Sequence, residues 1–499
     1  MKILSSSKFF KSIVVLLVLE AGWIALTGRY PMAFDEDFHF GLIKLYAHHI
    51  SPFWDAHPAG GDAFGALTRD PSYLYHYLMS FPYRLISVFT DSQTVQILIL
   101  RALNIALFAS SLPLFRRLLL KTGASRAMVH LSLLVFVLVP IVPLLAAQIN
   151  YDNLIMPLTA LALLLALRLK SRVLRKSFDL PALMQLLLVC LLASLVKYAF
   201  LPVFAVIVGF MAFHCLRTYD SWRRFGSALK VGWRKLGSWQ HWLLIASVIV
   251  GTGLFIERYE VNLVRYHTPV ADCAQVLSYA QCQHYAPWIR DYNLEQSKGP
   301  VINTSPLSYS YHEWFYGIWL RTFFAVDGPA SNFETRGPLV VPGLGAVVLT
   351  IASGVALLFT ARRLWRRYNA PALWLFSLAS LCYIAALWLS EYQLFVQTGQ
   401  PVAINGRYLL PVLSLGLSAV GLAVNELLQQ RHRLKLAFAG FVLVCFIWGG
   451  GALTYILRSS DYWYWPNPAV KTANHTVKRV LGPITPGYDK PTQFIRYQP

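Results

Sequence analysis

Long apolar stretches alternate with short polar segments along the whole chain. A helix needs roughly 20 apolar residues to cross about 30 Å of hydrocarbon, and somewhat fewer where the bilayer is thin. Stretches of about this length lie near residues 10–28, 94–115, 128–147, 154–169, 182–197, 199–216, 242–257, 338–360, 371–390, 408–427 and 434–456. The pattern therefore predicts an all-α polytopic membrane protein with about eleven transmembrane helices.

The apolar stretch from 182 to 216 is too long for one ordinary helix, and Lys197 and Pro202 interrupt it. The segments on either side of it, 168–176 and 217–235, are both strongly basic. Segments rich in Lys and Arg stay on the cytoplasmic side, so an even number of crossings must separate these two. We therefore expect a short helical hairpin that turns at Lys197.

Charge fits the same topology. The 499 residues are 56% hydrophobic and only 13% charged, with a formal net charge of +21. With a cytoplasmic N-terminus, 25 of the 44 Lys and Arg residues fall in cytoplasmic segments, and the C-terminus lies outside. The bilayer's orientation rule accounts for this charge, so it requires no nucleic-acid partner. Because no small-residue cleavage site follows the first apolar stretch, we expect it to remain as an anchor.

Three larger segments are expected outside: a first loop over 29–93, a second loop over 258–337 and a tail over 458–499, with residues 1–457 forming one transmembrane domain. These segments are rich in Tyr, Trp and Pro, which is typical of short helices and loops at the membrane interface. Cys273 and Cys282 share the second loop, in an oxidising compartment. A disulfide between them is therefore expected, with two unpaired thiols as the alternative.

The first loop concentrates the acids. Its sequence FDEDFHFGLIKLYAHHISPFWDAHPAGGDAFG holds, within about 30 residues, Asp35, Glu36, Asp37, His39, Asp55, His57 and Asp62. Apolar residues flank the first acids near the end of the first span, and burial there raises a carboxylate's pKa unless a partner offsets it. A solvated acidic loop is one interpretation and a functional site is the other. A divalent metal site also stays open, although no tight ligand spacing such as HExxH appears.

Ionisable residues in the apolar stretches favour the same side of the membrane. Glu20 and Arg101 lie at similar depth on the first two spans, where they can pair. Lys197 and Arg407 add cations near the outer leaflet, so three cations stand on three separate spans. Each alone is explained by snorkelling to lipid headgroups. If they converge, they form a site for an anion at membrane level, such as a lipid-linked phosphate.

The first loop also resembles a known family. FDEDFHFG followed by FWDAHP is similar to the FDE, HFG and D-x-HPP motifs of the protein O-mannosyltransferases, which belong to the GT-C glycosyltransferases. YDNLIMPL, SLVKYAFLP and NGRYLLP resemble pieces found among bacterial members of that superfamily. The chain departs from the mannosyltransferases in the inserted Asp37, in HPAGG for HPP, and in a second loop too short for their β-trefoil domain.

The resemblance implies a GT-C-like fold and a site in a multi-pass, bacterial plasma-membrane protein. The implied reaction is transfer of a sugar, such as a hexosyl or mannosyl group, from a polyprenyl-phosphate donor to an acceptor hydroxyl of a protein, glycan or lipid. It takes place on the outer face with inversion. Asp35 is the expected base, supported by Glu36 or Asp152. Glu36 or Asp37 is the competing candidate for the base, because the inserted residue shifts the spacing to His39. The expected substrate-binding residues are His39, Asp55, His57, Arg101, Lys197 and Arg407.

A transporter or lipid flippase is the alternative class of function. Such a protein would place charges along a path near the bilayer midplane, often on broken helices in corresponding halves of the chain. The sequence shows no such pairing of halves. No cofactor is identified from the sequence.

Overall fold

The computed structural model describes residues 2–175, 178–234, 236–298, 305–323, 326–329, 335–336 and 339–488. Helices dominate these residues, as the apolar pattern predicts. The two described strands, β1 (Val326–Asp327) and β2 (Thr335–Arg336), are two residues long each and pair antiparallel. Residues 489–499 are outside the described ranges, so the expected position of the C-terminus stays a prediction.

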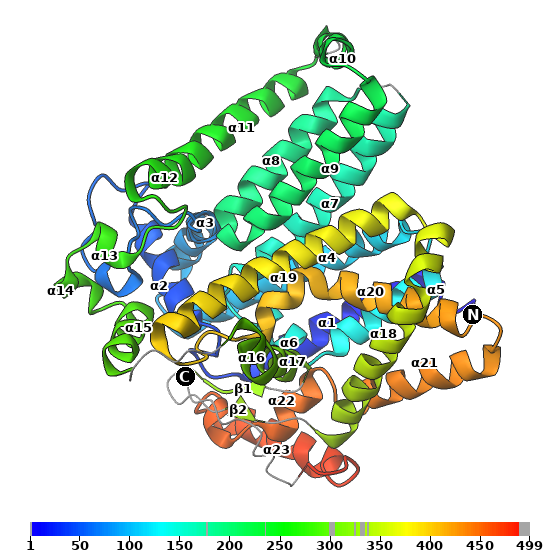
Figure 1. Cartoon of the computed structure of the whole chain (residues 1–499). Coiled ribbons are helices and arrows are strands. Elements are labelled where there is room, and N and C mark those ends of the chain that lie inside the picture. The colour runs from blue at the N-terminus through cyan, green and yellow to red at the C-terminus, as the bar shows by residue number, and fades with distance from the viewer. Residues whose placement is uncertain are drawn as a thin grey trace.

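Apolar helices, most of them long, make up the helical bundle of the molecule (Figure 1). They are α1 (Ser7–Thr27), α4 (Gln93–Leu120), α5 (Arg126–Leu138), α6 (Ile141–Ala146), α7 (Asp152–Leu174), α8 (Leu180–Val196), α9 (Leu201–Tyr219), α11 (Trp239–Phe255), α18 (Val340–Arg367), α19 (Ala370–Thr398), α20 (Leu410–Leu427), α21 (His432–Ile447) and α22 (Ala452–Arg458). Every predicted apolar stretch falls on one or two of these helices.

Within the described residues, eight helices are long and apolar enough to cross a membrane, and a ninth span results if α21 and α22, bent by 43°, count as one. α5 and α8 are apolar but shorter. A polytopic membrane protein is thereby confirmed, while the count of eleven stays a prediction. The break at Lys197 is confirmed, because α8 ends at Val196 and α9 begins at Leu201 after one turn of 3₁₀ helix, η2 (Tyr198–Phe200).

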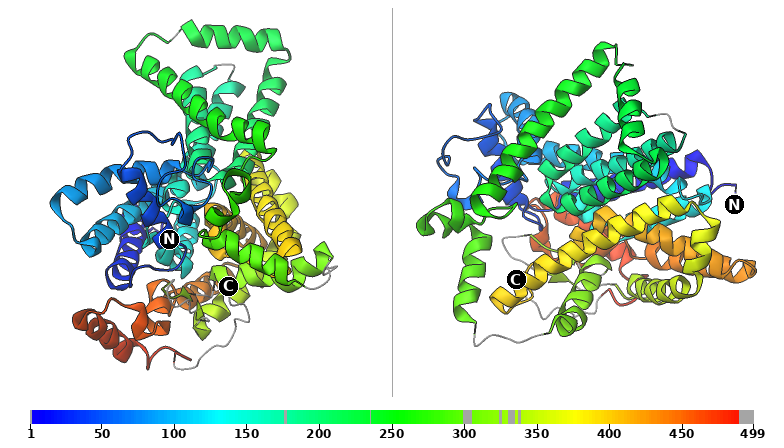
Figure 2. Two further views of the ribbon diagram at one scale, coloured as in Figure 1. Left: turned by 90° about the vertical axis from the view of Figure 1, so that its left-hand side faces the viewer. Right: turned by 45° about the horizontal axis from the view of Figure 1, so that its top comes forward.

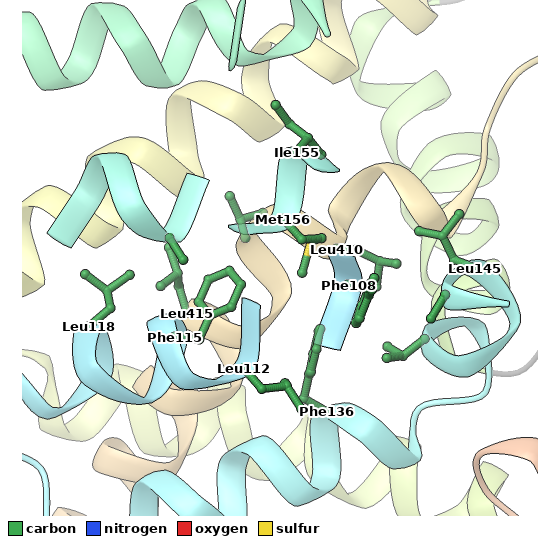
Figure 3. Close-up of a cluster of buried hydrophobic side chains, with 14 of the residues drawn as sticks. Phe108, Leu112, Phe115, Leu118, Phe136, Leu145, Ile155, Met156, Leu410 and Leu415 are labelled. Carbon is green, nitrogen blue, oxygen red and sulfur yellow. The ribbon is translucent and has the colours of Figure 1, made fainter. Parts of the chain in front are cut away.

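Apolar side chains interlock where α4, α5, α7 and α20 meet (Figure 3). Phe108 of α4 lies parallel to Phe136 of α5, with 6.3 Å between ring centroids. Met156 of α7 and Leu410 of α20 are buried in the same cluster. Since lipid tails are as apolar as these side chains, close packing rather than water exclusion holds such helices together. This core holds α7 and α20 in place, and α7 begins at Asp152 while α20 begins just after the turn that contains Arg407.

Shorter helices gather at one end of the bundle, which we call the site end. The first loop contributes α2 (Glu36–Ala47) and α3 (Leu74–Phe89), with a turn of 3₁₀ helix, η1 (Asp62–Phe64), between them. The second loop contributes α12 (Val261–Tyr266), α13 (Cys273–Val276), α14 (Tyr279–Cys282), α15 (Ala286–Ser297), α16 (Pro306–Tyr309) and α17 (Phe315–Phe323), with two π-helical turns, η3 (Ile256–Glu260) and η4 (Ser310–Trp314).

The disulfide expected in the second loop is confirmed, because Cys273 and Cys282 are bonded. Toward the C-terminus, η7 (Asp461–Trp463) and α23 (Pro468–Leu481) pack back against α1. Tyr464 forms a β-bridge with Gly28, and the indole of Trp23 donates a 3.0 Å hydrogen bond to Asn474. The described part of the tail is thus attached to the bundle.

The opposite end, where α7 ends at Leu174 and α9 ends at Tyr219, is called the basic end. Here α10 (Trp222–Arg234) connects α9 to α11. Figure 1 shows α10 end-on while α9 and α11 run in the plane of the view, and the left view of Figure 2 shows it lengthwise. α10 therefore crosses the ends of the long helices.

Candidate functional site

Asp35 occupies the start of α2, at the site end. Phe34 and Asp35 both have left-handed backbone conformations, with φ of 65° and 64°. Two successive non-glycine residues in this region are uncommon and are typical of functional segments. The side chain of Asp35 is 63% exposed, whereas that of the next residue, Glu36, is completely buried. The two neighbouring acids therefore have different environments.

Glu36 forms a bidentate ion pair with Arg101 of α4, with the guanidinium Nε and Nη2 at 2.8 and 2.7 Å from the two carboxylate oxygens. Both side chains are completely buried. The remaining hydrogen bonds around the pair involve the backbone: Arg101 Nη1 donates to Ala25 and Gly28, and Glu36 accepts from Met32 and Ile149. The pair joins α1, α2 and α4, and neither side chain is open to a substrate.

This pairing corrects two expectations. Glu20 does not pair with Arg101, because the guanidinium points to Glu36; the Glu20 carboxylate lies against Gly451 and accepts a backbone hydrogen bond from Ala452. Arg101 also does not join the other two site cations, since its guanidinium nitrogens donate to Glu36 and to the backbone of Ala25 and Gly28. The geometry accordingly assigns Glu36 and Arg101 to holding the start of α2 in place.

Arg407, 372 positions further along the chain, contacts Asp35. Its Nη2 donates to the Asp35 carboxylate at 2.6 Å. The residue lies in a 3₁₀ turn, η6 (Gly406–Leu409), whose tight packing requires glycine at 406, because a Cβ there would lie 2.4 Å from the backbone of Thr322. The Arg407 side chain is only 7% exposed, and its Nε and Nη1 have no hydrogen-bond partner among the described residues. Buried unpartnered donors of this kind call for an acceptor.

Lys197 pairs with Asp152, the first residue of α7, with 2.6 Å between Nζ and the carboxylate. The ammonium lies 4.7 Å from the ring centre of Tyr151 and 4.9 Å from that of Tyr408. Arg407 lies 5.1 Å from the same Tyr408 ring. Two of the three predicted cations therefore do converge, since both lie close to the same aromatic ring.

His39 and His76 form a buried pair next to Tyr151, with 2.8 Å between Nδ1 of His39 and Nε2 of His76. Burial lowers the pKa of His39 well below its usual value and the pKa of His76 to about 3, so both rings are neutral near pH 7. His39 also packs edge-on against Tyr151, with 4.6 Å between ring centres. His39, which was expected to bind substrate, is thus buried, and it packs against Tyr151 of the site.

Asp55 and His57 lie in a different part of the first loop. Asp55 is exposed, and His57 Nε2 lies 3.0 Å from the Asp62 carboxylate. Asp62 also accepts a 3.4 Å hydrogen bond from Gln281 of the second loop. His57 and Asp62 thus form part of the contact between the two loops, and among the described interactions neither they nor Asp55 contact the Asp35 cluster.

Among the residues that the structure describes, no three His, Cys, Asp or Glu side chains are grouped so that they could hold a metal ion.

Three features of the site were not assigned from sequence. Tyr151 and Tyr408 stand inside the quoted segments YDNLIMPL and NGRYLLP, beside residues that were assigned. Asp70 is a further carboxylate of the first loop: burial raises its pKa, while a 2.9 Å hydrogen bond from the Ser72 backbone opposes that shift. The phenol of Tyr285 is within electrostatic range of both Asp70 and Asp35. Of these residues, only Tyr151 and Tyr408 could have been proposed from the sequence, because they are adjacent to Asp152 and Arg407.

The fold and site together define a polytopic helical membrane protein with carboxylates and cations gathered at one end of its bundle. The family model for dolichyl-phosphate-mannose-protein mannosyltransferases matches residues 22–267. That range contains Asp35, Asp152 and Lys197, and Arg407 lies beyond it. The match supports the resemblance to GT-C glycosyltransferases that the first loop indicates.

Two solved structures are similar in part. One is the Archaeoglobus fulgidus oligosaccharyltransferase tethered to an acceptor peptide (13% identity, TM-score 0.45, 90% of this chain covered), and the other is AglB from the same organism with an inhibitory peptide and dolichol-phosphate (13%, 0.42, 89%). This chain covers 55% of the length of either. A comparison with curated protein sequences gives no match.

Proposed function

We propose that the protein is an integral membrane glycosyltransferase that moves a sugar from a polyprenyl-phosphate donor to an acceptor hydroxyl, with inversion at the anomeric carbon. One observation carries the proposal: Arg407 is buried, has two donor nitrogens without a hydrogen-bond partner in the described part of the chain, and lies 2.6 Å from the exposed carboxylate of Asp35. An anion-binding group and a proton acceptor therefore stand side by side, as transfer from a phosphate leaving group requires.

The phosphate of the donor is assigned to Arg407 and Lys197. Nη2 of Arg407 contacts Asp35, while Nε and Nη1 are left for phosphate oxygens. Each of these N–H groups can make a charge-assisted hydrogen bond to a phosphate oxygen, and Lys197, which contacts the same Tyr408 ring, adds a point charge. Arg101 has a positioning role in this scheme, because its pairing with Glu36 fixes the start of α2, where Asp35 stands.

Asp35 is assigned as general base. Its carboxylate takes the proton of the acceptor hydroxyl as the hydroxyl oxygen attacks the anomeric carbon. The bond between that carbon and the phosphate oxygen breaks, and the charge left on the lipid phosphate is stabilised by the two cations. Asp152 holds Lys197 in place at 2.6 Å. A single displacement of this kind inverts the anomeric carbon.

A groove close to Arg407 supports a lipid-linked donor. It has a volume of about 690 Å³ and lies among α17, η4, α18, α19 and α20, where its walls are mostly aromatic and aliphatic. Leu409, two residues after Arg407, is one of the lining residues. A polyprenyl chain in this groove would bring its phosphate toward the site end. The distribution of Lys and Arg supports a site on the outer face of a plasma membrane with the N-terminus in the cytoplasm.

Mass spectrometry of lipid that copurifies with the full-length protein tests the donor class. The wild type is expected to retain a polyprenyl phosphate or its sugar ester. Arg407→Gln should lose it, whereas Arg290→Gln, a partly exposed Arg on α15, should not. Retention of the lipid by Arg407→Gln at the wild-type level would contradict the assigned phosphate site. Lipid-independent uptake of a solute into vesicles would favour the transporter class instead.

A further inference from the structure

A separate apolar cavity of about 270 Å³ lies between α8 and α9. Phe204 and Tyr219 mark its extent along α9, which is about 22 Å at the helical rise of 1.5 Å per residue. Its wall toward the basic end includes Phe225 of α10. The other lining side chains are aliphatic, aromatic or sulfur-containing apart from one serine, as in Leu186, Cys190 and Ile207.

The cavity opens on the side of α9 that faces away from the bundle. Val208 and Leu216 line it and are 53% and 49% exposed, and Ala212 between them is also exposed. An engineered cavity of about 150 Å³ with aliphatic and aromatic walls stays free of water and binds benzene. A larger slot of the same chemistry, open to the bilayer, suits a hydrocarbon chain that enters from the side.

One polar group breaks the apolar lining at the basic end. Tyr219 is only 6% exposed, and its hydroxyl has no hydrogen-bond partner among the described residues. A buried phenol normally has a partner, since an unmade hydrogen bond costs free energy. The hydroxyl is a donor suited to a phosphate oxygen.

The surroundings of Tyr219 carry excess positive charge. The sequence segments 168–176 and 217–235 contain eleven Lys and Arg residues, and the nearby acids are Asp179 and Asp220. Each acid has an arginine partner: Arg172 lies 3.9 Å from Asp179, and Arg224 lies 3.3 Å from Asp220. Two acids cannot balance eleven cations, so these two sequence segments carry a net positive charge. A negatively charged headgroup complements such a surface.

α10 is also suited to a membrane surface. It crosses the ends of α9 and α11 (Figures 1 and 2), and its Val231 and Trp233 are each 53% exposed beside the basic Arg223 and Lys230. Exposed apolar and aromatic side chains next to cations are typical of a helix that lies in the headgroup region. The Tyr219 end of the cavity is then at the depth of lipid headgroups.

We propose that this cavity binds an anionic glycerophospholipid. One acyl chain lies between α8 and α9, and the headgroup phosphate accepts a hydrogen bond from Tyr219 among the basic residues of 168–176 and 217–235. The site is at the opposite end of α7 from Asp152, a helix of 23 residues, so it is distinct from the donor-phosphate site. A lipid held there would fill the space between α8 and α9, the two helices of the hairpin whose turn contains Lys197.

Native mass spectrometry of the full-length protein in a neutral detergent tests the proposal, with phosphatidylglycerol and phosphatidylcholine of identical chains as probes. The wild type should retain phosphatidylglycerol in preference to phosphatidylcholine. Ala212→Trp fills the mouth and should reduce retention at least tenfold. Ala246→Trp, the same change at an exposed alanine of α11 outside the cavity, should behave as wild type.

Tyr219→Phe keeps the shape of the side chain and removes its donor. Loss of a hydrogen bond to the charged phosphate should weaken phosphatidylglycerol binding about tenfold or more. Phosphatidylcholine carries the same phosphodiester, so its weaker binding should fall by a similar factor, and the preference for phosphatidylglycerol, which comes from the basic residues, should persist. Equal retention of the two lipids by the wild type would overturn the proposal, as would wild-type retention in Ala212→Trp. Wild-type affinity in Tyr219→Phe would overturn the headgroup contact, even if the tryptophan variant does not fold.

Discussion

Neutralising one member of the Glu36–Arg101 pair should destabilise the protein strongly. Both side chains are completely buried and share two hydrogen bonds of 2.7 and 2.8 Å. Glu36→Gln leaves the guanidinium as an uncompensated charge in a low-dielectric interior. Breaking a buried pair in this way costs about 3–5 kcal/mol of the free energy of unfolding. Arg101→Met should cost a similar amount, because Glu36 then stays charged and unpaired.

The double variant Glu36→Gln/Arg101→Met separates the pair from its neighbours. It removes both charges, so its loss of stability should be smaller than the sum of the two single losses. Reversible unfolding in mixed detergent micelles, followed by tryptophan fluorescence, measures all four members of the cycle. Arg224→Gln is the matched control: its partner Asp220 is 68% exposed, and such surface pairs contribute only about 0.2–1 kcal/mol.

The cycle also tests the positioning role of Arg101. If the single variants of the buried pair lose no more free energy of unfolding than the Arg224→Gln control, the pair does not hold the start of α2 in place. If Arg101→Met stays as stable as wild type and selectively loses affinity for a polyprenyl phosphate, Arg101 binds the donor directly. Either result would refute the reasoning from burial.

Three further predictions concern separate parts of the site end. Lys197→Met and Arg407→Gln should each weaken binding of a polyprenyl phosphate about tenfold or more, measured by titration, because each removes a charge-assisted contact; unchanged affinity in both would move the phosphate elsewhere. The free energy of unfolding should fall as pH drops from about 6.5 toward 3, because His76 becomes protonated in the unfolded chain but, with its pKa of about 3, stays neutral in the folded protein. His76→Gln should make this pH dependence less steep, and an unchanged dependence would contradict the prediction. Alkylation without reductant should leave Cys273 and Cys282 unmodified, and Cys273→Ser should lower stability by about 2–3 kcal/mol; two reactive thiols would disprove the bond.

Much of the fold follows from the sequence because the bilayer imposes strong rules. The lengths of the apolar stretches and the placement of Lys and Arg predict the positions of the long apolar helices, and Lys197 marks the break between α8 and α9. The shorter helices of the outer loops were expected without positions. The number of full crossings is harder to predict, since α5 and α8 are apolar but short.

The partners of the buried charges could not be read from the sequence. Depth along the first two spans suggests Glu20 for Arg101, but the arginine side chain reaches across to Glu36, which directly follows the left-handed turn at Asp35. Backbone conformation at Phe34 and Asp35 decides which acid points inward, and no residue pattern reveals it. The meeting of Asp35 and Arg407, 372 positions apart, likewise depends on how the helices pack.

Turnover by the Asp35→Asn variant tests the central claim most directly. The assay uses purified full-length protein with saturating polyprenyl-phosphate sugar and the acceptor hydroxyl in excess, and it includes Asp37→Asn, an exposed neighbouring acid, as the matched control. Because the asparagine keeps the size of the side chain but cannot accept the proton, transfer should fall by about 10²- to 10⁴-fold while donor binding persists. Asp37→Asn should retain activity. Near-normal turnover in Asp35→Asn, with activity lost instead in Asp37→Asn or Glu36→Gln, would contradict the assignment of Asp35 as the base.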